Sequence, residues 1–231
     1  MTLSQVVSES YLVYRGKLSS VPAVGSEKYN RIVSIANRKQ REWVQDSNVD
    51  WLSRYEMRVL GTLTTGNQEY DLDNDIMRLS DYVIITDLQG NKRYIQTLRP
   101  QVISRYKSGC YISGGNPQQL NFVTPIDSSF NGFALTVPCF TIPADMTTPT
   151  SVVSVEDPNW LIYATAAELA RNDYAKEEQY PNIIGQANDL YKNMVADAQA
   201  NGFLQINSVT NNMPQRQDFY GGANRTPFGY N

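Results

Sequence analysis

The chain has 231 residues, a formal net charge of −3 and no histidine. Its length allows one large domain or two small ones, and its mild negative charge gives it no general attraction for nucleic acid. The absence of histidine removes the commonest general base, the commonest neutral metal ligand and every serine–histidine or cysteine–histidine catalytic pair. Hydrolases and transition-metal enzymes therefore become poor candidates.

Two cysteines, Cys110 and Cys139, are too few for a disulfide framework or a zinc site. Both lie in strand-like runs, so we expect reduced thiols that act as small apolar fillers. The first residues lack the basic start and apolar stretch of a signal peptide, and no apolar run approaches the roughly 20 residues that span a bilayer. We expect a protein that is made in the cytosol, or packed into something assembled there, and has no membrane partner.

Two helices are predicted at the start of the chain. Thr2 and Gln5 have the spacing of a capping box, and Gly16 is a plausible helix end. A second helix is predicted after Ser26 as its N-cap, with Glu27 in its first turn. Apolar residues recur along that helix at helical spacing: Tyr29, Ile32, Val33, Ala36, Trp43 and Val44.

The middle of the chain has the pattern of short strands divided by turn residues. Candidate strands occupy residues 59–63, 68–72, 82–86, 93–97, 110–112, 119–123 and 133–137. Strands of this length at roughly ten-residue intervals are typical of an antiparallel β-sandwich or a small barrel.

Helical periodicity returns near the C-terminus. Asp157 is a predicted N-cap with Pro158 in the first helical position, and this helix is expected to end near Tyr174. A final helix is predicted from about Tyr180 to a C-cap at residues 201–202. The polar stretch after it, with isolated aromatics, predicts an extended arm.

The predicted fold is α+β, and it divides into four parts. Residues 1–56 and 151–202 supply the two N-terminal and two C-terminal helices of one bundle. Residues 57–150 form the inserted antiparallel β domain, and residues 203–231 form the C-terminal arm.

Motifs that would carry chemistry fail when examined closely. The acidic run at residues 71–75 resembles the start of a calcium loop, but Ile76 replaces the required glycine and Tyr82 the required glutamate. Residues 104–107 match the pattern S-x-x-K without the partner motifs that such an enzyme needs. The basic run at residues 38–41 favours a solvated helix face over a nucleic-acid patch. We therefore predict no catalytic, cofactor or metal site and no enzyme.

Several of these motifs together resemble a known family. They are Arg15-Gly16-Lys17, the pair Asp50-Trp51, the segment 66–72, Asp157-Pro158-Asn159-Trp160-Leu161 with residues 166–174 after it, and the helix start at 179–182. In this order they are similar to the head-to-tail connector proteins, or portal adaptors, of tailed bacteriophages. The resemblance covers most of residues 1–202 and is strongest at residues 157–174.

The resemblance implies a structural virion protein at the head–tail junction. Such proteins form a ring, usually of twelve subunits, that binds the portal protein and other tail or neck proteins, while double-stranded DNA passes through the central hole without specific binding. The helices would face the portal and neighbouring subunits, the β domain would point outward, and a C-terminal extension would insert into the portal assembly.

Candidate interface residues follow from this expectation. The arm contributes aromatics that could dock on the portal or a neighbour: Phe203, Phe219, Tyr220, Phe228 and Tyr230. Trp43, Trp51 and Tyr191 are candidates for the subunit interface, whereas Trp160 is expected in the core.

Two other functions remain open at this point. The β region could be a carbohydrate-binding module on a tail appendage, or another tail or neck structural module, with exposed tyrosines that stack on sugar rings. The chain could also be an enzyme whose lysine or carboxylate site escapes motif searches.

Overall fold

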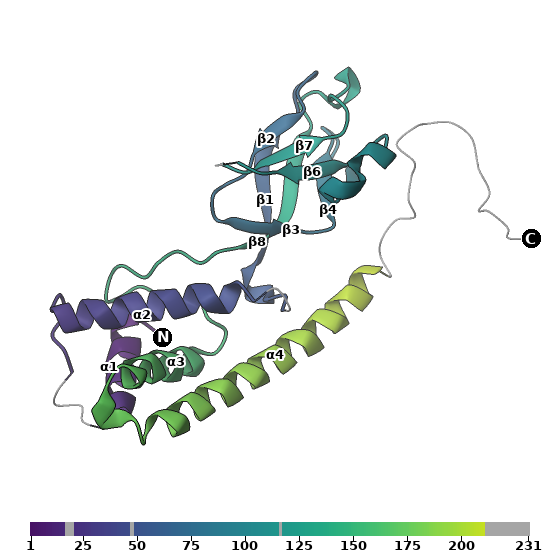
Figure 1. The fold of residues 1–231 in the computed structure, drawn as a ribbon. Coiled ribbons are helices and arrows are strands. Elements are labelled where there is room, and N and C mark those ends of the chain that lie inside the picture. Colours follow the sequence, from purple (N-terminus) through teal and green to yellow (C-terminus); the bar gives the residue numbers. More distant parts are fainter. Residues whose placement is uncertain (17–20, 47–48, 116, 211–231) are drawn as a thin grey trace, which may run out of the picture.

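The computed structural model describes residues 1–16, 21–46, 49–115 and 117–210, without the side chains of residues 100 and 201–210. It is an α+β structure with four α-helices and two antiparallel sheets, and no sheet closes into a barrel in the described ranges. Figure 1 shows the helices together at one end of the molecule and the strands at the other. The predicted class is confirmed at this level.

Side-chain caps fix where the helices begin. The Thr2 hydroxyl accepts from the Gln5 N–H at 3.4 Å, and the Thr2 N–H donates to Gln5 Oε1 at 2.8 Å, which completes the predicted capping box. Ser26 and Asp157 cap the second and third helices through backbone N–H groups of their first turns. The helices are α1 Leu3–Arg15, α2 Glu27–Val44, α3 Pro158–Arg171 and α4 Tyr180–Thr210.

The last helix is longer than the sequence pattern predicted. The expected end at residues 201–202 is wrong, because α4 continues to Thr210 and takes in residues assigned to the arm. A glycine inside a helix costs only about 1 kcal/mol relative to alanine, so Gly202 alone does not end one. The remainder of the predicted arm, residues 211–231, lies outside the described residues.

Eight strands form the two sheets in the described part of the chain. One sheet has the order β1-β8-β4-β5, with β3 also paired to β8, and the other has the order β2-β7-β6. The strand β3 was not predicted, because its four residues between acidic and polar turns show no clear alternation. The strands are β1 Tyr55–Thr62, β2 Glu69–Asp71, β3 Ile76–Leu79, β4 Tyr82–Thr86, β5 Lys92–Gln96, β6 Cys110–Ser113, β7 Gln119–Phe122 and β8 Ala134–Thr141.

The buried apolar residues form two separate clusters. The first belongs to the helical region, where α3 packs against α1, α2 and α4. The second contains residues from both sheets, including Leu120 of β7 and Leu135 of β8. Each region therefore has a core of its own, which is what an inserted β part requires.

Two buried amides of α2 tie the helical region to the connection between β8 and α3. The Asn37 side chain donates to the Met146 carbonyl at 3.1 Å and accepts from the Met146 N–H at 2.9 Å. Gln40 donates to the Ala144 carbonyl at 3.3 Å and accepts from the Ser154 N–H at 3.2 Å. These bonds satisfy buried backbone groups that no regular element pairs, so they fix the path of the chain between the two regions.

Candidate docking surfaces

A groove in the helical region lies between α2, α3 and α4. Its cavity has a volume of about 270 Å³, and alanines of α3 and α4 contribute to its lining. Charged residues also line it, and among them Lys39 pairs with Glu42 at 2.7 Å and with Glu168 at 3.7 Å. Apolar walls beside paired charges suit the contact of one protein with another more than the capture of a free ion.

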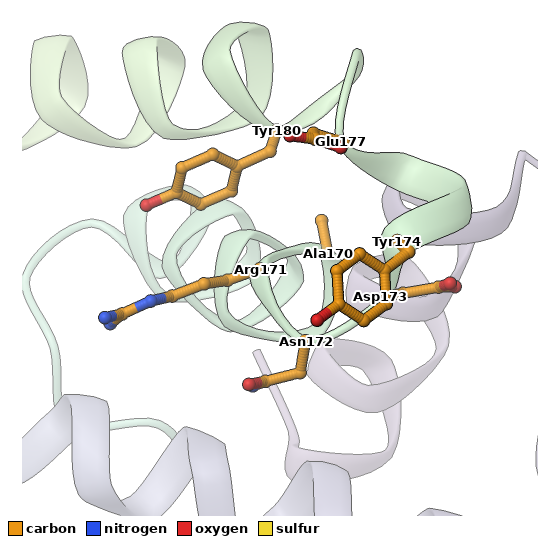
Figure 2. Close-up of a pocket in the computed structure, with 7 residues that line it drawn as sticks. All are labelled: Ala170, Arg171, Asn172, Asp173, Tyr174, Glu177 and Tyr180. Carbon is orange, nitrogen blue, oxygen red and sulfur yellow. The ribbon is translucent and has the colours of Figure 1, made fainter.

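A second cavity, of about 440 Å³, lies beside this groove at the turn between α3 and α4 (Figure 2). Tyr180 lines both cavities. The turn is held by Asp173, whose carboxylate accepts a hydrogen bond from the Tyr14 hydroxyl of α1 at 2.5 Å and another from the Ala175 N–H at 3.1 Å. Next to it the Tyr174 side chain is 96% exposed, so this anchored turn presents a large aromatic ring to solvent.

The bond between Tyr14 and Asp173 shifts the pKa of both groups. Burial and the hydrogen bond to Asp173 raise the pKa of Tyr14 to about 12. The same hydrogen bond lowers the pKa of Asp173 below its usual range. The pair therefore stays as neutral phenol and carboxylate through the neutral pH range, and it supports the turn rather than moving a proton.

The tryptophans predicted at a subunit interface lie in the core instead. Trp43 and Trp51 are each 1% exposed, and the Trp51 indole N–H donates to the Trp43 carbonyl at 3.0 Å. They therefore offer almost no surface to a neighbour, which corrects the expectation for both. Tyr191 is partly buried against Trp51 and Trp160, and its hydroxyl donates to Asp46. Trp160 is buried, as expected.

The predicted arm residues are only partly covered by the structure. Phe203 lies within α4, where the backbone alone is described. The other four candidates, Phe219, Tyr220, Phe228 and Tyr230, fall outside the described residues.

The sheet region carries an apolar face that sequence reasoning missed. Along β1, three apolar residues are exposed: Tyr55, Met57 and Val59, with exposed fractions of 36%, 49% and 64%. The alternate positions, Glu56 and Arg58, are charged and less exposed. A sheet with one solvated face normally shows the opposite arrangement, with polar side chains outward.

The register extends this apolar face across the sheet. Tyr55 lies opposite Phe140 of β8 with ring centroids 5.3 Å apart, and on the far side Tyr82 of β4 contacts Tyr94 of β5 at the same centroid distance. Val59 pairs with Thr136 of β8, Thr136 with Ile84 of β4, and Ile84 with Tyr94 of β5. Because residues paired across neighbouring strands share a face, all of these aromatic and apolar side chains lie on one face of the sheet. We call this set the outer sheet patch: Tyr55, Met57, Val59, Tyr82, Tyr94 and Phe140.

The opposite face of β1 holds an ionic cluster. Arg58 contacts Glu56, and it donates to Asp73 at 3.0 Å and to Asp75 at 2.5 Å. The hydrogen bond from Arg58 lowers the pKa of Asp75. The charged residues of β1 therefore pair on one face of the strand, and its other face carries the apolar side chains.

Acidic residues of the calcium-like run form ion pairs in the structure. Two acids of the calcium-like run, Asp73 and Asp75, bind Arg58, and the structure describes no group of three or more potential ligands that could hold a metal ion. Ser104 and Lys107 are both exposed, and no hydrogen bond joins them. Within the described ranges, no helix combines the length and the apolar character needed to cross a membrane.

The basic run of α2 is neutralised by neighbouring acids. Arg38 pairs with Glu168 at 3.0 Å, and Arg41 pairs with Asp145 at 2.9 Å. Lys39 is paired as described above. A run whose charges are already compensated offers little to a phosphate backbone, in keeping with the predicted solvated face.

No protein-family model matches the chain, and no curated protein matches it either.

Proposed function

We propose that the chain is a structural adaptor of a tailed-phage virion that binds the portal and starts the neck or tail. The observation that carries this proposal is the position of the residues that resemble the connector family. Residues 157–174 form α3 and the start of the turn after it, and α3 is the helix that packs against the other three. The resemblance therefore concerns the framework of the helical region, which suits a shared architecture rather than a shared chemistry.

The proposal includes a specific arrangement of the two regions. The four helices act as one bundle that meets the portal and neighbouring subunits, and the two sheets act as a sandwich that points toward tail parts. A ring of such subunits, twelve in the related family, leaves a central channel for DNA. With a net charge of −3, each subunit lets DNA pass rather than gripping it.

Co-sedimentation with the portal protein of the same phage tests the proposal. The full chain is expected to sediment with portal assemblies. Replacement of the exposed Tyr174 by serine at the anchored turn should weaken binding at least tenfold. The matched control Tyr106→Ser changes an exposed tyrosine of the sheet region and should leave binding unchanged. Full-length protein that stays in the supernatant at saturating portal would refute the proposal.

A second candidate function rests on one cavity of the sheet region. This cavity of about 350 Å³ has an apolar part that includes Ile85, Ile95 and Phe122. Ser108, Thr124, Asp127, Ser129 and Phe130 also line it, and hydroxyls, a carboxylate and an aromatic ring suit a sugar. A glycan array is the direct test. Specific binding to one sugar class, lost in Asp127→Ala, would favour this alternative, and an array without signal would dismiss it.

A further inference from the structure

The strand β1 lies at an open edge of its sheet. On one side it pairs with β8 from Tyr55 to Thr62, and the sheet order ends there. No backbone hydrogen bond in the described part of the chain reaches the other edge of β1. A strand of eight residues therefore presents a row of free N–H and C=O groups.

Natural proteins often protect such an edge with charged side chains, a bulge or a covering loop. In β1 the charged residues Glu56 and Arg58 lie on the inner face and the register shifts only between Val59 and Gly61, so Tyr55–Val59 form a regular edge. Here the outward residues Tyr55, Met57 and Val59 are apolar and exposed, and they continue into the aromatics of the outer sheet patch. A free edge beside an exposed apolar face is the geometry that accepts an added strand: the edge supplies backbone hydrogen bonds, and the patch receives alternate side chains.

We propose that residues 226–231 of a neighbouring copy of this chain add to β1 as a strand, with Phe228 and Tyr230 lying on the outer sheet patch. Phe228 and Tyr230 are two positions apart, so both point to one face of an extended strand, as Tyr55 and Met57 do. The residue between them is Gly229, which has no side chain to collide with the opposite face.

Charge supports the same orientation. Arg225 lies an odd number of residues before Phe228, so it falls on the opposite face of an extended strand. On that face three carboxylates, Glu56, Asp73 and Asp75, lie near two arginines, Arg58 and Arg54. The added strand therefore brings a positive charge to an acidic cluster and two aromatic rings to an apolar patch.

The arm is long enough to reach a neighbouring copy, and the direction in which α4 ends makes that copy the source of the strand. Residues 211–228 span about 60 Å when extended, which exceeds the diameter of about 45 Å expected for a compact chain of this length. Figure 1 shows α4 ending on the side of the sheet region where β4 and β6 are labelled, with β1 further away. Each copy then donates one strand and accepts one, the head-to-tail contact from which rings and filaments are built.

This contact joins copies of the chain to one another, so it does not depend on the portal being the partner. Its test accordingly uses the purified full-length chain alone. A chain that fails to bind portal could still form the contact, and a chain that binds portal could lack it.

Photo-cross-linking between labelled copies tests the inference. Val59 is replaced by p-benzoylphenylalanine in the full chain, and equal amounts of ¹⁴N-labelled and ¹⁵N-labelled protein are mixed, irradiated and digested with trypsin. Because cleavage after Arg225 releases residues 226–231 as one peptide, mass spectrometry identifies the cross-link directly. The control places the same group at Val24, which is 63% exposed against 64% for Val59 but lies before α2.

The inference predicts cross-links from position 59 to residues 226–231 that pair one light and one heavy peptide, and none from position 24. The double substitution Phe228→Ser with Tyr230→Ser should reduce this cross-linking at least tenfold while leaving the circular dichroism spectrum unchanged. Cross-links that join only peptides of the same isotope would overturn the inference in favour of the chain's own tail. Absence of any cross-link to residues 226–231 would also overturn it.

Discussion

Cys110 and Cys139 show how burial sets the chemistry of single residues in this protein. Both side chains have no exposed area. Burial raises the pKa of the Cys110 thiol to about 12 and that of the Cys139 thiol to about 11. Since the thiolate is the reactive form, both groups are poor nucleophiles in the folded chain. The structure thus places both cysteines in the core, as their sequence context predicted.

The first prediction concerns the reactivity of these thiols. Neither should react with Ellman's reagent in the folded protein at mildly alkaline pH, and both should react within minutes after unfolding in guanidinium chloride. Absorbance at the thionitrobenzoate band measures both. A thiol that reacts as fast in the folded as in the unfolded protein would show that the sheet core is more open than described.

Asn37 gives a second test at the scale of one residue. Asn37→Ala leaves the N–H and the carbonyl of Met146 buried without partners, so we expect a loss of about 3 kcal/mol in the free energy of unfolding. Urea unfolding curves measure this. Asn30→Ala, on the exposed face of the same helix, should cost less than about 0.5 kcal/mol. Equal losses in the two variants would contradict the described role of the Asn37 amide.

Among the elements, β1 departs furthest from the usual pattern, because its charged residues face inward. Arg58 lowers the pKa of Asp75, so this carboxylate stabilises the folded state at pH values above its ordinary pKa of about 3.9. The stabilisation is lost as the pH falls through the lowered folded-state pKa. The acid side of the stability profile therefore reports on the cluster.

The third prediction follows from the direction in which Asp75 makes stability depend on pH. Asp75→Asn should lower stability at neutral pH and flatten the fall in stability below about pH 4, since the proton that Asp75 takes up on unfolding is removed. Denaturation midpoints measured across the acid range give the profile. Asp71→Asn, whose carboxylate bonds to Gln119 rather than Arg58, should keep the steep profile of the parent chain. Identical profiles for the parent and Asp75→Asn would contradict the ionic cluster.

The sequence predicted most elements because their signals are local. Thr2, Ser26 and Asp157 place the starts of three helices, and each cap is present. The miss at β3 and the early end assigned to α4 have local causes too: a short strand lacks alternation, and a glycine near a helix end resembles a cap.

Side-chain contacts between distant elements were harder to predict. Periodicity assigns Trp43 to one face of α2, but it does not say whether that face meets the chain's own helices or a neighbour, so an interface was expected where the structure has a core. Asn37 and Gln40 could have been noticed as amides beside the apolar stripe of α2, but their backbone partners lie more than a hundred residues away. The outer sheet patch could have been suspected from the alternation of Tyr55, Met57 and Val59 with Glu56 and Arg58.

At the scale of the whole molecule, the two buried clusters lead us to expect a chain that folds without its last residues. Among the residues whose side chains the structure describes, both buried clusters end at or before Ala198. A chain that ends at Thr210 should therefore keep the thermal unfolding midpoint of the full chain within about 2 °C, measured by circular dichroism. A much lower midpoint would mean that residues 211–231 complete the fold within one copy.

The central claim, that this chain is a portal-bound adaptor, is tested most directly by cryo-electron microscopy of purified virus particles. The account predicts a ring of density at the neck, between portal and tail, into which the helical region fits with the sheet region pointing outward. Particles whose neck is well resolved and contains no density for this chain would contradict it.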